Sequence, residues 1–187
     1  MVDARIVHTT GVLRAAILRL AAERPVSRIT VSDVTRAAGI NRATFYAHAV
    51  SPGSLLAQVL MPELDQVRIE DAAARHLPGS DPAALTRTAI DRVVDHIVTY
   101  REIYRRALPD PDDGSLHRLL AGHFAESCIE HIAQLPAAHR PDMLDDVAAA
   151  FIGHGLVGAV EAWLAGPRRS RRALADTMSA SFPTWWR

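Results

Sequence analysis

Lysine is absent from this 187-residue chain, so arginine and protonated histidine are its only positively charged side chains. The arginines are unevenly distributed. Residues 1–60 carry seven arginines against three acidic residues, whereas the remainder carries 14 against 18. A basic end on a chain of zero net charge predicts a region that meets a polyanion. A GC-rich genome also favours arginine over lysine, and this explanation of the composition stays open.

The sequence also lacks the features of a disulfide-bonded, secreted protein. Cys128 is the single cysteine, which excludes an internal disulfide and is typical of a reducing compartment. Residues 1–20 lack the apolar stretch and small-residue cleavage site of a signal peptide. Residues 147–166 are long enough to span a bilayer, but they include His154 and Glu161 and lack flanking aromatic belts. We therefore predict a cytoplasmic protein without a membrane partner.

Signals for β-strands are scarce. Aromatic residues make up 5% of the chain, β-branched runs are short, and no stretch alternates convincingly between apolar and polar residues. Alanine, leucine and arginine dominate, and these residues favour helix. Because 49% of the residues are hydrophobic, the chain can bury one sizeable core. The composition predicts an all-α protein.

Helix boundaries are well marked near the N-terminus. An amphipathic helix is predicted over residues 5–23, and Pro25 requires it to end there. Thr30 is a good N-cap for the next helix, with Asp33 placed three residues later for a capping box. Gly39 supplies the left-handed C-cap that ends this helix.

A second short helix follows almost at once. Asn41 is its predicted N-cap, and Ser51 with the proline after it begins the next helix. If Phe45 points inward, two alanines project outward with hydrogen-bonding side chains on both sides. This ridge fits the DNA major groove, because alanines allow the backbone to approach base edges. The candidate DNA-binding residues are Thr30, Ser32, Asn41, Arg42, Ala43, Thr44, Tyr46, Ala47, His48 and Ser51.

A compact corner of a helical bundle would give a similar pattern, but a family resemblance favours DNA binding. Residues 29–56, ITVSDVTRAAGINRATFYAHAVSPGSLL, resemble the DNA-binding region of TetR-family transcriptional regulators. The shared residues are Ala-Gly-Ile at 38–40, Thr-Phe-Tyr at 44–46, His48 and Leu-Leu at 55–56. The remainder of the chain is similar to the family only in layout.

Two positions depart from the family's pattern. Ala49 stands where a core aromatic residue is usual, and Pro52-Gly53 stands where Lys-Glu is usual. The family's lysine typically touches a phosphate, so its loss predicts weaker DNA binding with a shallower salt dependence. A TetR-like dimer that has weak or lost DNA binding, and acts as a ligand-binding or protein-interaction module, is therefore the alternative function.

The resemblance implies a two-part, all-α organisation of about nine helices. A three-helix helix-turn-helix domain occupies residues 1–56, and a helical dimerisation and effector-binding domain occupies residues 57–187. The implied function is a sequence-specific transcriptional regulator, a ligand-responsive repressor that binds a palindromic operator in double-stranded DNA as a homodimer. Two-fold dimers suit such modules because one reading helix contacts few base pairs.

The strongest candidate for the dimer interface is a helix predicted from Pro141 to about Ala165. It is apolar nearly all round, so one side can face its own core and the other a partner. Its glycines would let helices approach closely, and a central core helix of a monomer is the alternative. The candidate interface residues are Phe151, Gly155, Gly158, Ala162 and Trp163. Trp185 and Trp186 have no obvious core, and either pack on a neighbour or fray.

An unknown small-molecule effector is implied by the resemblance. Polar and aromatic side chains near predicted inner faces have the mixture that ligand sites tend to have, although packed core is the alternative for each. These candidates are His96, Tyr100, Phe124, Cys128, Phe151 and His154.

No pattern for catalysis or metal binding stands out. Nine histidines are present, but they form no closed zinc-ligand set, and Cys128 and His131 share only an i, i+3 spacing. A phosphate loop, a nucleophile elbow and a specific pair of carboxylates are also missing. We predict no metal, no cofactor and no enzyme activity.

Overall fold

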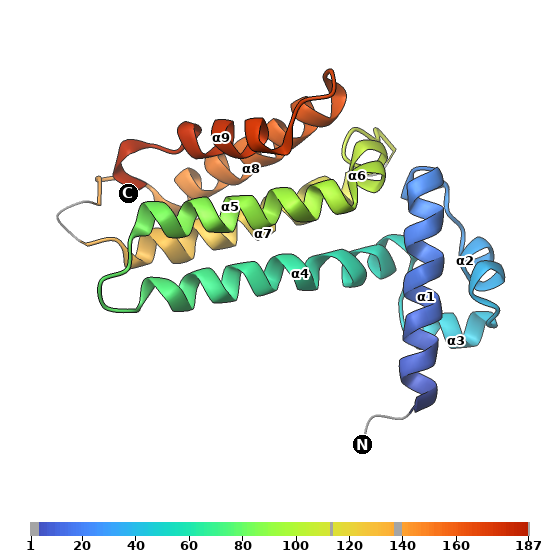
Figure 1. The fold of residues 1–187 in the computed structure, drawn as a ribbon. Coiled ribbons are helices and arrows are strands. Elements are labelled where there is room, and N and C mark those ends of the chain that lie inside the picture. The colour runs from blue at the N-terminus through green and yellow to red at the C-terminus, as the bar shows by residue number, and fades with distance from the viewer. Residues whose placement is uncertain (1–3, 113, 137–139, 187) are drawn as a thin grey trace. The chain divides into compact units, whose positions relative to one another are not determined.

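The computed structural model describes residues 4–112, 114–136 and 140–186. These residues contain nine α-helices and two short 3-10 helices, with no strand among them (Figure 1). The predicted all-α fold class is therefore confirmed. The chain forms two compact units, the first comprising Met1–Pro62 with Tyr100–Leu116 and the second Glu63–Thr99 with His117–Arg187.

The first unit contains the helices of the predicted DNA-binding region together with a later segment of the chain. Its elements are α1 (Ala4–Glu23), a 3-10 helix (Val26–Arg28), α2 (Val31–Ala38), α3 (Arg42–Tyr46), the start of α4 (Pro52–Arg75) and α6 (Arg101–Ala107). Helix α1 packs on both α2 and α6 (Figure 1). Fully buried side chains hold it together: Leu13, Ile17, Val34, Phe45, Leu56, Leu60 and Tyr104.

Arg14 ties three segments of this unit together. Its guanidinium donates to the carbonyl oxygen of Val59 (3.2 Å) and to the hydroxyl of Tyr100 (2.9 Å). These bonds connect α1 to α4 and to the residue that precedes α6. Residues 100–116 therefore belong structurally with the N-terminal helices, although about 40 residues of chain separate them.

The second unit is a bundle of long helices. Its elements are the remainder of α4, α5 (Pro82–Thr99), α7 (Ser115–Gln134), α8 (Asp145–Ala165), α9 (Arg171–Ser181) and a 3-10 helix (Thr184–Trp186). Within it α9 packs against α5 and α8 (Figure 1). The prolines and caps read from the sequence mark several of these ends; Asp81, for example, accepts hydrogen bonds from the amides of Ala83 (2.9 Å) and Ala84 (3.2 Å).

Two predicted helices are shorter than expected. Helix α8 begins at Asp145 rather than Pro141, because Leu144 has an extended backbone and acts as the N-cap. The acidic residues in the first turn, Asp145 and Asp146, favour that start through the helix dipole. Helix α3 has five residues instead of two turns, because the amides of His48 and Ala49 both bond to the carbonyl of Phe45.

The glycines of α8 have different surroundings. A Cβ atom at Gly153 would lie 2.8 Å from the carbonyl oxygen of Ala121 and 2.9 Å from the amide nitrogen of Ala125, so α7 and α8 approach closely there. Gly155 and Gly158 have nothing within 4 Å of such an atom. Close packing of α7 on α8 therefore requires glycine at position 153, whereas Gly155 and Gly158 lie on an open face of α8.

Among the described residues, α8 alone is long and apolar enough to cross a membrane. About a third of its apolar window is buried within the chain. A core or interface helix of a water-soluble protein meets the same criterion of length and composition.

Candidate nucleic-acid interface and ligand cavity

Side chains at the start of α2 form a capping box. The hydroxyl of Thr30 accepts from the amide of Asp33 (3.1 Å), and the carboxylate of Asp33 accepts from the amide (3.0 Å) and hydroxyl (2.8 Å) of Thr30. These hydrogen bonds, with the nearby charges of Arg24 and Arg36, lower the pKa of Asp33. Gly39 ends α2 with a φ of 67°, a conformation that glycine adopts without strain.

The next two helices are capped in the same way. The side-chain oxygen of Asn41 accepts from the amide (2.8 Å) and hydroxyl (3.0 Å) of Thr44 at the start of α3. Ser51 and Ser54 exchange two hydrogen bonds of 3.1 Å each at the start of α4. Four of the predicted DNA-binding residues, Thr30, Asn41, Thr44 and Ser51, therefore hold the helices in place in the free chain.

The predicted outer ridge of α3 is exposed. Phe45 is completely buried beneath it, while Ala43 and Ala47 are exposed and Tyr46 is 57% exposed. The rings of Phe45 and Tyr46 meet edge to face with centroids 5.5 Å apart, which directs the tyrosine outward. His48 is half-buried and so less available than the other candidates.

One hydrogen bond links the two helices across the turn. The exposed guanidinium of Arg42 donates to the hydroxyl of Ser32 at 2.6 Å. Both residues are predicted DNA contacts, and this hydrogen bond brings the first turn of α2 and the first turn of α3 together. Ala49, the first departure from the family's pattern, is buried, and Pro52 is the first residue of α4.

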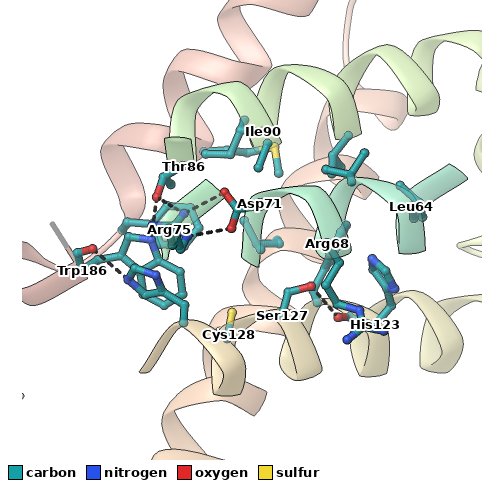
Figure 2. A pocket seen from close by; sticks show the side chains of 18 residues that line it. Leu64, Arg68, Asp71, Arg75, Thr86, Ile90, His123, Ser127, Cys128 and Trp186 are labelled. Carbon is teal, nitrogen blue, oxygen red and sulfur yellow. Dashed lines mark hydrogen bonds and ion pairs between the residues drawn. The ribbon is translucent and has the colours of Figure 1, made fainter. Parts of the chain in front are cut away.

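A cavity of about 80 Å³ lies in the second unit, bordered by residues of α4, α5, α7, α8 and α9 (Figure 2). Its walls are mainly apolar. Phe124 and Cys128, two predicted ligand-binding residues, line it, and burial raises the pKa of the Cys128 thiol to about 12. That thiol therefore acts as an apolar wall rather than as a nucleophile.

A chain of polar contacts closes one part of the cavity (Figure 2). Arg75 makes two hydrogen bonds to the carboxylate of Asp71 (2.7 and 3.1 Å) and a third to the hydroxyl of Thr86 (2.9 Å). The indole of Trp186 donates to the same hydroxyl at 3.1 Å. Trp186, the last described residue of the chain, is thus bonded to α5 and linked through Thr86 to α4. The expectation that Trp186 frays or packs on a neighbour is wrong, because the residue is buried within its own chain.

His131 completes this network. Its Nε2 lies 2.9 Å from the carbonyl oxygen of Trp186, and its ring stacks on the indole with centroids 4.0 Å apart. Burial, assisted by the charge of Arg75, lowers the pKa of His131 to about 4. The imidazole is therefore neutral at neutral pH.

The other four ligand candidates lie outside this cavity. His96 is buried, but it pairs with the carboxylate of Glu63 at 2.9 Å, and burial lowers its pKa. Tyr100 belongs to the first unit, where it bonds to Arg14. Phe151 is 81% exposed and His154 is also exposed, because both occupy the outer side of α8.

The predicted dimer residues divide into two groups. Gly155, Gly158 and Ala162 are exposed together with Phe151, so they share an open face of α8. Phe151 and Gly155 also border a groove of about 510 Å³ along α8 and the end of α9. Trp163 is buried within its own chain and therefore does not belong to this face.

Two of the three histidines of α7 each contact a carboxylate. His117 lies 2.8 Å from Glu161, and His123 lies 3.2 Å from Asp65. No group of three potential metal ligands occurs in the part of the chain that the structure describes.

The polar residues of the cavity were not among the residues predicted from the sequence. The i, i+4 pair of Asp71 and Arg75 was visible as a pattern, although many surface pairs have the same spacing. Thr86 and Trp186 are 100 residues apart, and no sequence signal joins them.

Comparison with known proteins supports the family assignment. Residues 13–59 match the family described as bacterial regulatory proteins, tetR family. A relative from Bacillus subtilis (strain 168), named as the uncharacterized HTH-type transcriptional regulator YxbF, is 43% identical over 56 residues. That segment is 29% of this chain and 15% of the relative, so most of the relative lies outside the match.

Solved structures match the chain over most of its length. A TetR-family transcriptional regulator from Syntrophomonas wolfei has a TM-score of 0.68 at 14% identity, covering 92% of this chain and 91% of that one. NalD of Pseudomonas aeruginosa, described as the secondary repressor of the MexAB-OprM multidrug efflux pump, has a TM-score of 0.63 at 21% identity, covering 91% and 94%. The matches are to regulators rather than enzymes, as predicted. Residues 13–59 of this chain therefore match the tetR family of bacterial regulatory proteins, and most of the chain has the fold of the TetR-family regulator from Syntrophomonas wolfei.

Proposed function

We propose that this chain is a cytoplasmic, sequence-specific transcriptional repressor that binds a palindromic operator as a homodimer and responds to a small-molecule effector. In this proposal residues 1–56 bind DNA and residues 57–187 dimerise and bind the effector. The observation that carries it is the exposed ridge of α3, in which Ala43, Ala47 and Tyr46 project over a buried Phe45.

The ridge supports DNA binding because of its shape and chemistry. Its small centre allows the backbone to approach base edges, while Tyr46 and Thr44 offer hydrogen-bonding groups beside it. Arg42 supplies a positive charge at the start of the helix, where it can reach a guanine or a phosphate. Asn41, Thr44 and Ser51 cap their helices, so they orient the ridge whether or not they touch DNA.

The homodimer is supported by the open side of α8. Phe151 is 81% exposed, and Leu144, the N-cap of α8, is 71% exposed. Gly155 and Gly158 leave the helix backbone open farther along the helix. Large apolar side chains on a surface helix mark an interaction site. Two-fold pairing through this side would present two α3 ridges to two half-sites.

The cavity of the second unit supports the effector. An effector that binds better to one conformation shifts the population toward it, and this changes the affinity for operator DNA. NalD, a structural neighbour, is described as a repressor, and the proposal of repression follows that description.

The decisive experiment is the selection of binding sites from a random double-stranded DNA library by the purified chain. We expect enrichment of an inverted repeat, and retardation of that sequence but not of a scrambled one in gel shifts at two salt concentrations. A shallower salt slope than expected for a lysine-containing homologue would agree with Pro52 and Gly53 at the start of α4.

Variants of the ridge test the contacts directly. Arg42→Ala and Tyr46→Ala should each weaken specific binding by about 1–3 kcal/mol. The free energy of unfolding should change by about 1 kcal/mol or less, because Arg42 loses only the exposed bond to Ser32 and Tyr46 is exposed. Arg118→Ala is the matched control, because it removes an exposed arginine from α7 in the other unit. Unchanged affinity for both ridge variants would remove these residues from the interface, and absence of any specific binding at low salt would favour the alternative ligand-binding or protein-interaction module.

The dimer has its own test. Phe151→Glu places a charge on the exposed side of α8 and should shift the sedimentation of the chain from dimer to monomer. Loss of specific DNA binding should accompany that shift. A wild-type chain that sediments as a monomer at micromolar concentration would contradict the homodimer.

A further inference from the structure

The segment that joins α8 to α9 carries the densest positive charge of the chain. This basic segment comprises Arg168, Arg169, Arg171 and Arg172, and no acidic residue occurs between Glu161 and Asp176. Fourteen arginines and 18 acidic residues follow residue 60, so without these four the balance is ten against 18. The basic segment therefore interrupts an otherwise acidic part of the chain. Such a local excess of one charge indicates a partner of the opposite charge.

Two arginines of the basic segment are exposed and not neutralised. Arg168 and Arg169 lie in a run of exposed residues, 167–173, and neither has a carboxylate partner in the part of the chain that the structure describes. Ser170 fixes the backbone beside them, because its hydroxyl oxygen accepts a hydrogen bond of 3.2 Å from the amide of Ala173 and caps α9. The two charges are therefore attached to a backbone that the start of α9 holds in place.

The other two arginines have carboxylate partners that an incoming anion can replace. Arg171 pairs with Asp95 of α5, and Arg172 lies 3.6 Å from Asp176. Asp176 also accepts a hydrogen bond of 2.5 Å from Arg87, so its charge is shared between two arginines. Exposed ion pairs contribute little to stability, and both arginines can therefore exchange a carboxylate for another anion at small cost.

The chemistry of the basic segment favours a phosphate backbone over a lipid surface. Segments that bind membranes combine basic residues with exposed apolar side chains that enter the lipid. The large apolar neighbours here, Trp163, Leu164 and Leu174, are buried within the chain, so none of them accompanies the arginines into a bilayer. The planar guanidinium group of arginine matches the oxygens of a phosphate in pairs, and a DNA duplex presents a row of phosphates.

The place of the basic segment in the second unit also favours DNA. Arg171 contacts Asp95, which lies about one turn before the end of α5 at Thr99. The next residue, Tyr100, belongs to the first unit, which contains the α3 ridge. The basic segment thus lies at the end of the bundle from which α5 continues into the first unit (Figure 1).

We propose that the basic segment is a second DNA contact, which binds phosphates of the duplex that flanks the operator half-site while α3 binds the half-site itself. The inference rests on the proposed function, because the specific complex brings the duplex to the chain. Arg168 and Arg169 make the contact, and Arg171 and Arg172 turn from their carboxylates to phosphates as the duplex approaches. These contacts carry no sequence information, but they raise the affinity and the salt dependence of binding.

Operators of two lengths test the proposal. The short duplex contains the selected inverted repeat alone, and the long duplex adds about two helical turns of unrelated sequence on each side. Fluorescence anisotropy with the full chain should give about tenfold tighter binding to the long duplex at moderate salt. Arg168→Gln combined with Arg169→Gln should remove most of this gain. It should also lower the salt slope on the long duplex by about 1.8, since each phosphate contact contributes about 0.9.

A matched control separates a local contact from a general effect of charge. Arg118→Gln combined with Arg140→Gln removes two exposed arginines from other parts of the second unit and changes the net charge equally. This variant should keep the gain on the long duplex. Equal losses for the two double variants would overturn the proposal.

Hydroxyl-radical footprinting locates the contact. On the long duplex the wild-type chain should protect backbone outside the inverted repeat. The Arg168→Gln, Arg169→Gln variant should protect the repeat alone. A wild-type footprint confined to the repeat would overturn the proposal.

Two further outcomes separate this inference from the proposed function. Specific binding with equal wild-type affinities for the two duplexes would keep the regulator and remove the second contact. Selection of no operator at all would contradict the regulator, and the inference would fall with it. Vesicles that contain phosphatidylserine test the lipid alternative. Retention of the wild type but not of the Arg168→Gln, Arg169→Gln variant, with unchanged DNA binding, would assign the basic segment to a membrane surface and overturn the proposal.

Discussion

The candidate DNA-binding site and the cavity differ in how far apart in the sequence their contacting residues are. In the first unit the helix caps join residues three apart, as in Thr30 with Asp33 and Asn41 with Thr44. In the second unit the cavity contacts join His131 to Trp186 across 55 residues and Thr86 to Trp186 across 100. Local contacts can be recognised from spacing, whereas distant contacts depend on how the whole bundle packs. The candidate DNA-binding site is therefore formed by residues close together in the sequence, whereas the cavity is formed by residues from distant segments.

The largest expected effect comes from Phe45, which supports the ridge from beneath. Phe45→Ala should lower the free energy of unfolding by about 3–5 kcal/mol, because it leaves a cavity in a fully buried position. Tyr46→Ala, one residue away and exposed, should change it by about 0.5 kcal/mol or less. Urea unfolding measures both. Similar losses for the two variants would mean that the ridge is not anchored as described.

The next largest effect tests the assembled site. Trp186→Ala removes the stacked indole and its hydrogen bond to Thr86, and should cost about 3 kcal/mol. Trp185→Ala, at a half-buried position, is the neighbouring control and should cost clearly less. Thermal unfolding compares them. If Trp186→Ala matched Trp185→Ala, the C-terminal segment would not contribute to the second unit as the contacts indicate.

Acid should weaken the second unit through His131. Burial lowers its pKa to about 4 in the folded chain, whereas the unfolded histidine titrates near about 6.5. Between these values the unfolded chain binds more protons, so the free energy of unfolding falls as the pH is lowered. We expect a loss of about 1–2 kcal/mol between pH 7 and pH 5.

The pH experiment needs a variant that lacks this titration. Unfolding of His131→Phe should depend less on pH over the same range. His96 and His123 also have lowered pKa values because of burial, so a residual slope of the same sign is expected. An identical slope in wild type and variant would show that His131 is charged or exposed when folded.

The smallest expected effect tests a local contact. Thr30→Ala removes the capping oxygen of α2 and should cost about 1 kcal/mol of stability. Thr30→Ser keeps that oxygen and should restore most of the loss. The midpoint of urea unfolding measures the series, and a serine variant as unstable as the alanine variant would rule out the capping explanation.

Much of the first unit could be predicted from the sequence. Caps at Thr30 and Asn41, the C-cap at Gly39 and the inward direction of Phe45 all follow from chemistry within a few residues. The length of α3 was overestimated because periodicity does not reveal that two amides share the carbonyl of Phe45.

The second unit was predicted only in outline. Its helices follow from apolar spacing and proline positions, but the cavity does not, because Arg75, Thr86, His131 and Trp186 come from four separate elements. Tyr100 and Phe151 were placed with the ligand candidates because residue type and periodicity do not distinguish a face that packs from one that stays open. Whether the predicted DNA and dimer residues act as proposed stays a prediction for the experiments above.

The hydrogen bond between Arg42 and Ser32 has a consequence for the energetics of docking. Arg24 and Arg36 face the carboxylate of Asp33, so part of their charge is cancelled before any nucleic acid arrives. Arg42 instead rests on an uncharged hydroxyl. When Arg42 turns toward an incoming polyanion, the chain loses one solvent-exposed hydrogen bond of about 1 kcal/mol. The guanidinium keeps its full positive charge for the new contact.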